Sequence, residues 1–441
     1  MAPAVTRRLL IWAGITVCLT AEARAPLTYL FTLAPRYEPD AWMRGEERFP
    51  AGASVYLAGS GSERRRIAPD FSASADASVS HDGTRVLFAG KRTPAGPWQI
   101  WETSVAGGTP RQITQGDSSC IRPLYLPDGR VVYTRQVQRG TVVEVSRPDG
   151  TGVEWLTFAP GRYLTDDVLR DGRILMEVVR EVGRDLFTVY PDGTGIESMR
   201  CDHGHDRSEG RQLSSGDVVF QDGARLARIR SASARQSELP QPKDGALGPV
   251  AEAGPDRWLL AARRSGSEHA AVYLWDASGK QLMSLQSPRD ESAVQPVMVA
   301  PRTPPRDFPS ALLKSRRAAN VLCLNAGRSP EPYDGVARWV RVYGQVAEGR
   351  PAVLGQAGVE KDGSFFVEVP GDRAVRFELL DGDGRILRSE RNWIWFRTGE
   401  QRICLGCHVG PEQASENRLP EVLRGRPAPV VLKVSPASPA P

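Results

Sequence analysis

A short segment near the C-terminus carries the most specific chemistry in the chain. It reads Cys404-Leu-Gly-Cys-His408. Two thiols at this spacing can form thioethers to the two vinyl groups of a haem, and the histidine after the second cysteine then lies under the iron as an axial ligand. A closed zinc site would need four ligands, and no second Cys/His pair lies nearby in the sequence. The motif therefore predicts one covalent c-type haem held by Cys404, Cys407 and His408.

The ligand on the other side of such an iron is left open by the sequence. Beyond Met298 the chain has no methionine, and its only histidine there is His408. A sixth ligand of the common types must come from the preceding region or from another molecule, or it is absent and the iron is open to a small ligand. The candidates within the chain are His81, His203, His205, His269, Met176, Met199, Met283 and Met298.

A second group of polar residues reads Cys201-Asp-His-Gly-His205-Asp206. Thiolate, imidazole and carboxylate together suit zinc or another divalent metal. The repeat described below places this group in one ring with Cys120, Tyr163 and Asp166, and places His81 on the opposite face. The alternative is a solvated polar rim that holds no ion. The residues expected to hold a second metal, or to supply the distal haem ligand, are His203, His205, Cys201, Cys120 and Asp206.

The N-terminus has the pattern of a secretory signal peptide. Arg7 and Arg8 precede a mostly apolar run over residues 9–20, and small residues follow at Ala21, Ala23 and Ala25. We therefore expect residues 1–25 to direct export to the periplasm or beyond. The run is short for a bilayer span, so membrane association is expected only if the signal stays uncleaved.

Cysteine usage and charge limit the partners. With Cys18 in the signal and two cysteines in the haem motif, Cys120, Cys201 and Cys323 are left, an odd number that allows one disulfide plus a free thiol, or a metal ligand. Net charge is +5, and the arginines are scattered, with Arg64–Arg66 as their longest run. No basic stripe favours nucleic acid. A redox protein of the cell envelope is the expected partner.

The elements that would position these residues follow a repeat. Turn signatures at Asp82-Gly83, Asp128-Gly129, Asp171-Gly172 and Ser215-Gly216 are spaced by 46, 43 and 44 residues, and each precedes a β-rich run. A second turn signature lies about 20 residues further on in each unit. Two hairpins per unit, with no helical period between them, are typical of four-stranded propeller blades.

The number of repeat units predicts a closed ring of blades. Five lie near residues 72–116, 118–160, 163–205, 208–246 and 248–290. A sixth forms if the N-terminal strand Ser54–Leu57 pairs with Val294–Ala300. We predict a six-bladed propeller over residues 53–300, with seven blades as the alternative. Blade endings such as Arg111-Gln-Ile-Thr114 resemble those of the propellers of the periplasmic Tol system.

The rest of the chain is also expected to be β-structured, which makes the fold class all-β. A Pro-rich linker covers residues 301–317, and alternating runs such as Trp339–Tyr343 predict a small β-sandwich over residues 318–397. The haem-binding segment follows at 398–426, and the low-complexity tail 427–441 is expected to be disordered.

The whole mature chain, propeller plus C-terminal module, resembles the family of the hydrazine synthase alpha subunit and the exported proteins related to it. The resemblance is carried by Asp362-Gly-Ser-Phe-Phe366, Val369-Pro370, Leu379-Leu-Asp381, Trp393 to Trp395, Gly399-Glu400, Arg402, Cys404 to His408 and Glu416-Asn-Arg-Leu-Pro420. It implies a six-bladed propeller, a haem domain beside it and a metal near the haem. The synthase subunit has a second haem, and one of its haems is ligated by a tyrosine shortly after the attachment motif, whereas this chain has one motif and no tyrosine after Tyr343. These departures argue against hydrazine synthesis.

Three functions fit these features. The first is an exported mono-haem protein that transfers electrons and uses the propeller as a docking platform. The second is an open-haem oxidoreductase acting on a small nitrogen or oxygen compound, for which no catalytic residue can be named. The third is a haem sensor that binds a partner. In each, Trp393 and Trp395 are candidates to wall the haem unless they are sandwich core, and the candidates to pair with its propionates, unless simply solvated, are Arg397, Arg402 and Arg418.

Overall fold

The computed structural model describes residues 27–59, 63–180, 183–200, 202, 204–243, 245–263, 266–329, 333–345, 351–406, 417–425 and 428–432. Over these ranges the chain is almost entirely β-structured. The helical elements described are the 3₁₀ turn η1 (Ala41–Arg44) and the short α1 (Glu421–Gly425). None of the described helices has the length and apolar character needed to cross a membrane. The predicted signal, residues 1–25, lies outside the described residues.

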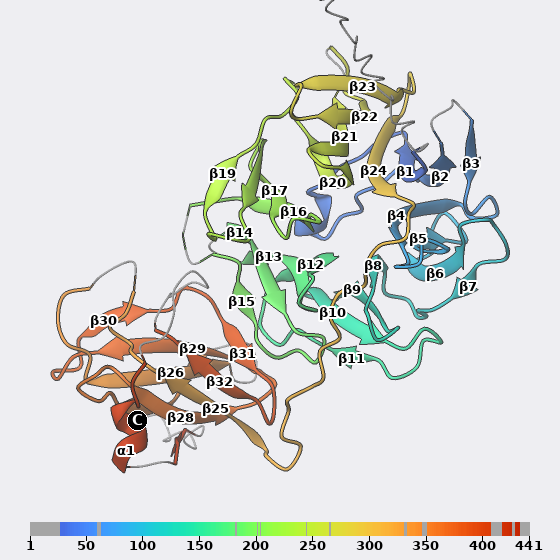
Figure 1. The fold of residues 1–441 in the computed structure, drawn as a ribbon. Coiled ribbons are helices and arrows are strands. Elements are labelled where there is room, and N and C mark those ends of the chain that lie inside the picture. The colour runs from blue at the N-terminus through green and yellow to red at the C-terminus, as the bar shows by residue number, and fades with distance from the viewer. Residues whose placement is uncertain are drawn as a thin grey trace, which may run out of the picture.

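Six four-stranded antiparallel sheets surround a central channel (Figure 1). This confirms the predicted propeller. The first complete blade along the chain is β4 (Ala73–Val79), β5 (Arg85–Lys91), β6 (Gln99–Ser104) and β7 (Arg111–Gln112). The next two are β8 (Cys120–Tyr125), β9 (Val131–Val137), β10 (Gly140–Ser146) and β11 (Glu154–Trp155), then β12 (Arg162–Val168), β13 (Ile174–Arg180), β14 (Gly183–Val189) and β15 (Glu197–Ser198). They are followed by β16 (Arg207–Gln212), β17 (Val218–Asp222), β18 (Arg225–Ile229) and β19 (Gln236–Glu238), and by β20 (Leu247–Gly254), β21 (Arg257–Arg263), β22 (Ala270–Asp276) and β23 (Gln281–Gln286).

The ring closes through a sheet built from both ends of the propeller. It has the order β24 (Ser292–Met298), β1 (Tyr29–Ala34), β2 (Ser54–Ala58) and β3 (Arg64–Arg66). The expected partner of residues 294–300 was Ser54–Leu57, but β1 lies between them and pairs with both. Strand β1 is buried along its whole length, so its sequence lacks the alternation and turn signature that identify the other strands.

The Asp-Gly turns explain where the strands turn back. In each of three blades the aspartate carboxylate accepts a hydrogen bond from the backbone N–H two residues on, as Asp82 Oδ1 does from Thr84 N at 3.0 Å. The glycine then adopts a left-handed conformation, with φ of 75° at Gly83. An Asx turn followed by glycine is a low-cost way to reverse a chain between β4 and β5.

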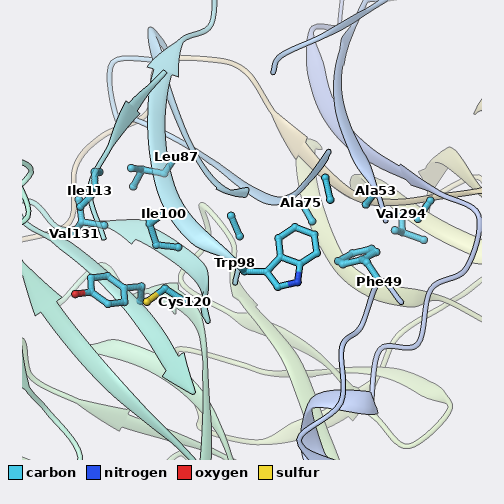
Figure 2. Packing of buried hydrophobic residues seen from close by; sticks show 14 of the residues in the cluster. Phe49, Ala53, Ala75, Leu87, Trp98, Ile100, Ile113, Cys120, Val131 and Val294 are labelled. Carbon is cyan, nitrogen blue, oxygen red and sulfur yellow. The ribbon is translucent and has the colours of Figure 1, made fainter. Parts of the chain in front are cut away.

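Apolar side chains fill the space between neighbouring blades. Figure 2 shows one such cluster, where Trp98, Ile100 and Leu87 of one blade meet Val131 and Cys120 of the next. Most members are almost fully buried, so close packing holds neighbouring blades together. Hydrogen bonds between blades add to it, as from Cys120 N to Trp98 O at 2.7 Å and from Thr165 N to Thr134 Oγ1 at 3.0 Å.

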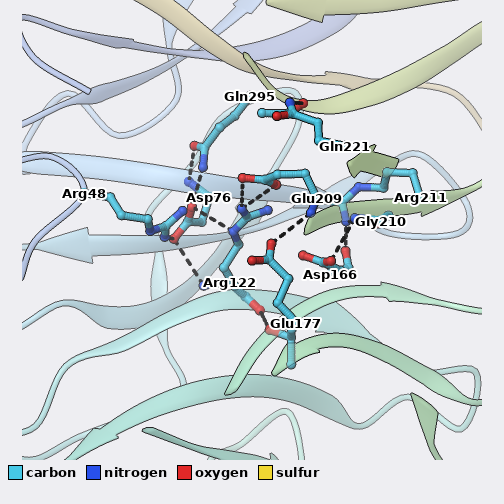
Figure 3. Close-up of polar contacts among 12 residues, drawn as sticks. Arg48, Asp76, Arg122, Asp166, Glu177, Glu209, Gly210, Arg211, Gln221 and Gln295 are labelled. Carbon is cyan, nitrogen blue, oxygen red and sulfur yellow. Dashed lines mark hydrogen bonds and ion pairs between the residues drawn. The ribbon is translucent and has the colours of Figure 1, made fainter. Parts of the chain in front are cut away.

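Polar residues gather instead on the channel (Figure 3). The innermost strand of each complete blade has a register shift, as between Ala75 and Ser78 in β4 or Ile121 and Leu124 in β8. Asp76, Arg122 and Glu209 lie in these bulges with φ of 56°, 53° and 56°, respectively. A bulge re-aims a side chain that a regular strand would point elsewhere. The bulges therefore turn charged side chains of separate blades toward one another.

The second domain is a β-sandwich, as predicted. One sheet has the order β32 (Gln401–Cys404), β25 (Ala318–Cys323), β28 (Phe365–Pro370) and β33 (Val430–Val431). The other has β27 (Pro351–Gly358), β26 (Trp339–Gln345), β29 (Arg373–Leu380) and β30 (Ile386–Ser389), with β31 (Ile394–Phe396) also on β29. Their facing side chains form a single core, which includes Val321, Val367, Val342 and Val375.

The end of the chain corrects one expectation. Disorder was expected from residue 427, but Val430 and Val431 pair with β28, and Leu432 is buried in the sandwich core. The low-complexity composition concealed a short apolar run, because Val430-Val-Leu432 is flanked on both sides by proline-containing sequence.

The two domains are in direct contact at the blade that contains β14 and β15 (Figure 1). Trp395 is fully buried in the core of that blade, and its indole N–H donates to the carbonyl oxygen of Gly193 at 3.0 Å. Glu400 accepts a hydrogen bond from Gly195 N at 3.2 Å, and Arg397 donates to the carbonyl of Asp192. In the linker, the ring of Phe308 stacks on Tyr190 at 3.8 Å between centroids. The sandwich is thus docked by buried apolar and polar contacts together.

Candidate functional site

An interdomain cavity of about 520 Å³ lies beside this contact. The propeller lines it with residues of β13 to β15 and of the loop before β16, and the C-terminal domain lines it with residues 390–392, 394 and 402–406. Its apolar wall includes Phe187, Ile196, Ile394 and Ile403. The cavity therefore depends on both domains, and neither could form it alone.

Cys404 lines this cavity at the end of β32. Strand β32 runs parallel to β25 with Cys404 in register with Cys323, and this pairing fixes where the chain leaves the sheet. Burial raises the pKa of the Cys404 thiol, while the nearby Arg402 acts in the opposite sense. Leu405 and Gly406 continue along the cavity wall. Cys407 and His408, the other two predicted haem ligands, lie outside the described residues.

His205 lines the same cavity from the propeller side. Its Nδ1 lies 2.8 Å from Asp222 Oδ2, and its Nε2 lies 3.6 Å from Asp202 Oδ2. A carboxylate can only accept, so Nδ1 carries the proton that faces Asp222. Histidines that ligate metals commonly have this arrangement, in which a carboxylate fixes the tautomer and the ring orientation.

Of the other distal-ligand candidates, none in the described chain lines the cavity. Met176 is buried in a blade core, Met283 is exposed on the outermost strand β23, and Met298 packs at the closure sheet. His81 is half-buried at the turn before β5, where burial first and then Arg302 lower its pKa to about 4. His203 and Cys201 lie outside the described residues.

The predicted metal ring does not form as expected. Cys120 is fully buried in the apolar cluster of Figure 2, and burial raises its pKa to about 11. Asp206 forms an ion pair with Arg184, with Oδ1 2.7 Å from Nε. Tyr163 packs under Trp395, and Asp166 lies on the channel. Blade register placed these residues at one level of the propeller, but their side chains have different surroundings, and His205 is the one of this set within the described chain that lines the cavity.

The tryptophans and arginines predicted to surround the haem lie in different places in the structure. Neither Trp393 nor Trp395 lines the cavity, since Trp395 docks the domains. Arg397 is paired with Asp372 at 2.6 Å. Arg402 lines the cavity and donates to the carbonyl of Ile196 at 3.2 Å. Arg418 lies in another hollow, beside Leu405 and Pro420.

Sequence reasoning missed Arg180, at the end of β13. It lines the cavity, its three guanidinium nitrogens are buried, and none of them has a hydrogen-bond partner among the described residues. The guanidinium faces the ring of Phe187 at 4.5 Å. Burial lowers the pKa of Arg180, while Tyr163 and Glu390 act in the opposite sense. Nothing local distinguishes Arg180 from the many other arginines in the sequence, so only the structure could select it.

A group of three buried carboxylates on the channel was also missed: Asp166, Glu177 and Glu209 have ligand atoms within 4.8 Å of one another. Arg122 donates to both oxygens of Glu209 at 2.6 Å, and Glu177 accepts from Glu209 N at 2.9 Å (Figure 3). Burial raises the pKa of Asp166 to about 6 and that of Glu177 well above its usual range. Arg122 pairs with Glu209, and Arg184 Nη1 lies 3.8 Å from Glu177 Oε2, whereas Asp166 Oδ1 has no hydrogen-bond partner among the described residues. Arginines therefore neutralise only part of this group.

The interdomain cavity has the chemistry of a site for a large amphiphilic ligand with anionic groups. Apolar side chains form part of its wall, and charged side chains of both signs form the rest. Among them the guanidinium of Arg180 has no hydrogen-bond partner in the described chain. Ligand sites generally combine an apolar lining with a few placed polar groups. A planar macrocycle with two carboxylates fits this donor set, and Cys404 supplies a thiol at its edge.

Fold and site together define a class of protein: a six-bladed propeller joined to a β-sandwich, with a cavity between them at a Cys-x-x-Cys-His segment. The family model for the middle domain of the hydrazine synthase alpha subunit matches residues 343–409, which include this segment. The chain therefore resembles the hydrazine synthase alpha subunit family, as its sequence motifs predicted.

Comparisons with individual proteins give the extent of this similarity. Hydrazine synthase subunit alpha of Kuenenia stuttgartiensis is 26% identical over 152 residues, which cover 32% of this chain and 19% of that subunit. The match thus spans about a fifth of the relative's length. The solved structure of Kuenenia stuttgartiensis hydrazine synthase has the same fold, with a TM-score of 0.77 at 17% identity over 90% of this chain and 71% of that one. TolB from Acinetobacter baumannii aligns with a TM-score of 0.48 at 13% identity, over 62% of this chain and 67% of that one.

Proposed function

We propose that this chain is an exported mono-haem c-type redox protein, with the haem in the interdomain cavity. Cys404 and Cys407 would hold it by thioethers, and His408 would be an axial ligand. The observation that supports this most strongly is that Cys404 lines a cavity of about 520 Å³ whose lining also includes apolar side chains of both domains and His205. A bound haem would supply reversible one-electron chemistry there.

The described residues then have assignable roles. Phe187, Ile196 and Ile394 would exclude water, which raises the cost of charge in the cavity. His205 would offer Nε2 as the distal ligand, because Asp222 keeps the proton on Nδ1. Electron transfer to a redox protein of the cell envelope would use the propeller as its docking platform. A divalent metal such as zinc at His205 and Asp202 is the competing use of that imidazole.

The test is to mature the full chain in a periplasm that attaches c-type haem. We expect a covalent haem, retained on a denaturing gel, with a c-type spectrum after reduction. The double variant Cys404→Ala/Cys407→Ala should carry none, whereas Cys120→Ala, which removes a buried thiol outside the cavity, should keep it. Absence of haem from the well-expressed wild type would refute the proposal.

An open-haem oxidoreductase acting on a small nitrogen or oxygen compound is the second candidate. It is favoured by the titratable groups in the cavity: burial raises the pKa of Asp185, and Glu197 and Glu390 lie in the same lining. Carbon monoxide separates the two candidates. A reduced spectrum that does not change with the gas would favour electron transfer through a closed iron, and a shifted one would favour the enzyme or a sensor.

A further inference from the structure

A second hollow, here called the basic cleft, lies on the other side of Arg180. Its volume is about 550 Å³, and both domains line it. Arg180, Arg391 and Asn392 line the cavity and the basic cleft alike, so they form the partition between the two.

The charge of the basic cleft has a single sign. Five arginines line it, and no aspartate or glutamate is among its described lining residues. The arginines are Arg139, Arg162, Arg180, Arg376 and Arg391. None of the five forms an ion pair with any carboxylate of the described chain, although most arginines elsewhere in the propeller do. Like charges that line one hollow repel one another, and a bound anion would offset this repulsion.

Two of these arginines are oriented by the fold. Arg376, on β29, lies against the rings of Trp393 and Tyr343, with its guanidinium carbon 5.2 and 5.4 Å from their centroids. Its Nε is buried and has no partner in the described chain. Arg180 approaches from β13 on the propeller with three such nitrogens. Ring contacts stabilise the faces of both guanidinium groups and leave the N–H edges to be satisfied.

A buried, unpaired guanidinium is costly, and proteins usually keep one only when it has a binding role. The planar fork of N–H donors matches two oxygens of a carboxylate, phosphate or similar oxyanion. We propose that Arg180 and Arg376 bind a small oxyanion or carboxylate in the basic cleft, at the seam between the propeller and the sandwich. Because one arginine comes from each domain, the bound anion bridges them.

Two sources could supply such a group. A free oxyanion would enter from solvent through the basic cleft, where Arg139 and Arg391 are exposed. A propionate of a haem in the cavity would reach Arg180 across the partition. The site itself does not require the haem, so this proposal and the proposed function can fail separately.

The test uses the full chain made with and without haem attachment, and inorganic phosphate as the probe at constant ionic strength. Phosphate should raise the unfolding midpoint of the haem-free chain in a saturable way, because a ligand that binds only the folded state stabilises it. Arg180→Met keeps the length of the side chain and removes the charge. We expect it to raise the midpoint without phosphate and to weaken phosphate binding by at least about tenfold, which corresponds to the loss of one charge-assisted contact.

Arg376→Gln should also weaken phosphate binding, while Arg225→Met, at an exposed arginine paired with Glu238, should change nothing. A phosphate response lost on haem attachment identifies the propionate as the occupant, and a response kept in both forms identifies a free oxyanion. The proposal is overturned if neither form responds to phosphate, or if Arg180→Met lowers the midpoint and leaves binding intact. That second result would mean that Arg180 only supports packing.

Discussion

At the scale of single residues, His205 is the side chain whose surroundings best fit ligation. Asp222 accepts from Nδ1 at 2.8 Å, and no other distal-ligand candidate of the described chain lines the cavity. The two residues are distant in sequence, since Asp222 ends β17 and His205 lies in the loop before β16. The pairing of those two strands brings the carboxylate to the ring.

The first prediction concerns His205→Ala. If Nε2 is the distal ligand, this variant should convert a low-spin haem to a high-spin one that binds carbon monoxide, and added imidazole should restore the low-spin spectrum. His269→Ala is the matched control, because His269 does not line the cavity. A low-spin spectrum unchanged by His205→Ala would instead assign the ligand elsewhere, for example to a residue outside the described chain.

At the scale of elements, the bulges of the innermost strands decide the character of the channel. They turn Asp76, Arg122 and Glu209 inward, and Gln295 of β24 joins them through a 2.7 Å hydrogen bond to Asp76. Burial acts to raise the pKa of Asp76, but Arg48 and Arg122 outweigh it and hold the pKa below its usual value. For Asp166 burial outweighs the nearby arginines and raises the pKa, so the network contains one carboxyl with a lowered pKa and one with a raised pKa.

Asp166 gives the second prediction. Its pKa is about 6 in the folded chain against 3.8 for the ordinary carboxyl, so the folded state holds the proton more tightly than the unfolded state. The associated stability is present below about pH 4 and is lost as the pH rises through about 6. Asp166→Asn cannot ionise. Relative to wild type, its unfolding free energy should therefore improve by roughly 1–3 kcal/mol between pH 4 and pH 7.

The measurement is chemical denaturation at several pH values, with Asp70→Asn as an exposed control. Equal pH profiles for Asp166→Asn and wild type would show that Asp166 is ionised throughout this range. That result would assign the proton to Glu177, whose pKa is also raised by burial and by neighbouring carboxylates.

At the scale of the whole molecule, docking of the two domains creates both hollows. Trp395 sits in the core of the third complete blade, 6.0 Å from the ring of Tyr163, although it belongs to the sandwich strand β31. A buried side chain of this size contributes several kcal/mol through contacts that neither isolated domain could offer it. The cavity and the basic cleft therefore persist only while this contact holds.

Trp395→Ala tests this. Removing a buried tryptophan costs about 3–5 kcal/mol of stability. Here we expect the substitution to weaken the contact between the two domains. Calorimetry should show the sandwich unfolding separately from the propeller, and limited proteolysis should cut the linker faster. Trp155→Ala, at a tryptophan that is 52% exposed, should leave a single transition in place. If Trp395→Ala unfolds in a single transition and its unfolding free energy falls by less than about 1 kcal/mol, docking depends on other contacts.

The amino-acid sequence alone determined the repeat, and with it the fold class. Asp-Gly turns at regular spacing are local signals, since Asp82 and Gly83 act within a few residues of themselves. The alternation of β26 likewise predicted a sandwich strand with one face in the core. Cys404-Leu-Gly-Cys-His408 indicated a haem because both thiols and the imidazole lie within one short segment of the chain. Strand β1 escaped notice because burial on both faces leaves no period to detect.

Only the tertiary structure decided which distant residues share a site. Cys120 and His205 occupy related places in their blades, but one is packed in a core and the other lines the cavity. Arg180 ends the propeller strand β13 and Arg376 lies on the sandwich strand β29, with the rest of the propeller and the linker between them in sequence, yet both line one cleft. Side-chain direction in a blade depends on bulges and on the neighbouring blade. Those are long-range properties that local spacing does not encode.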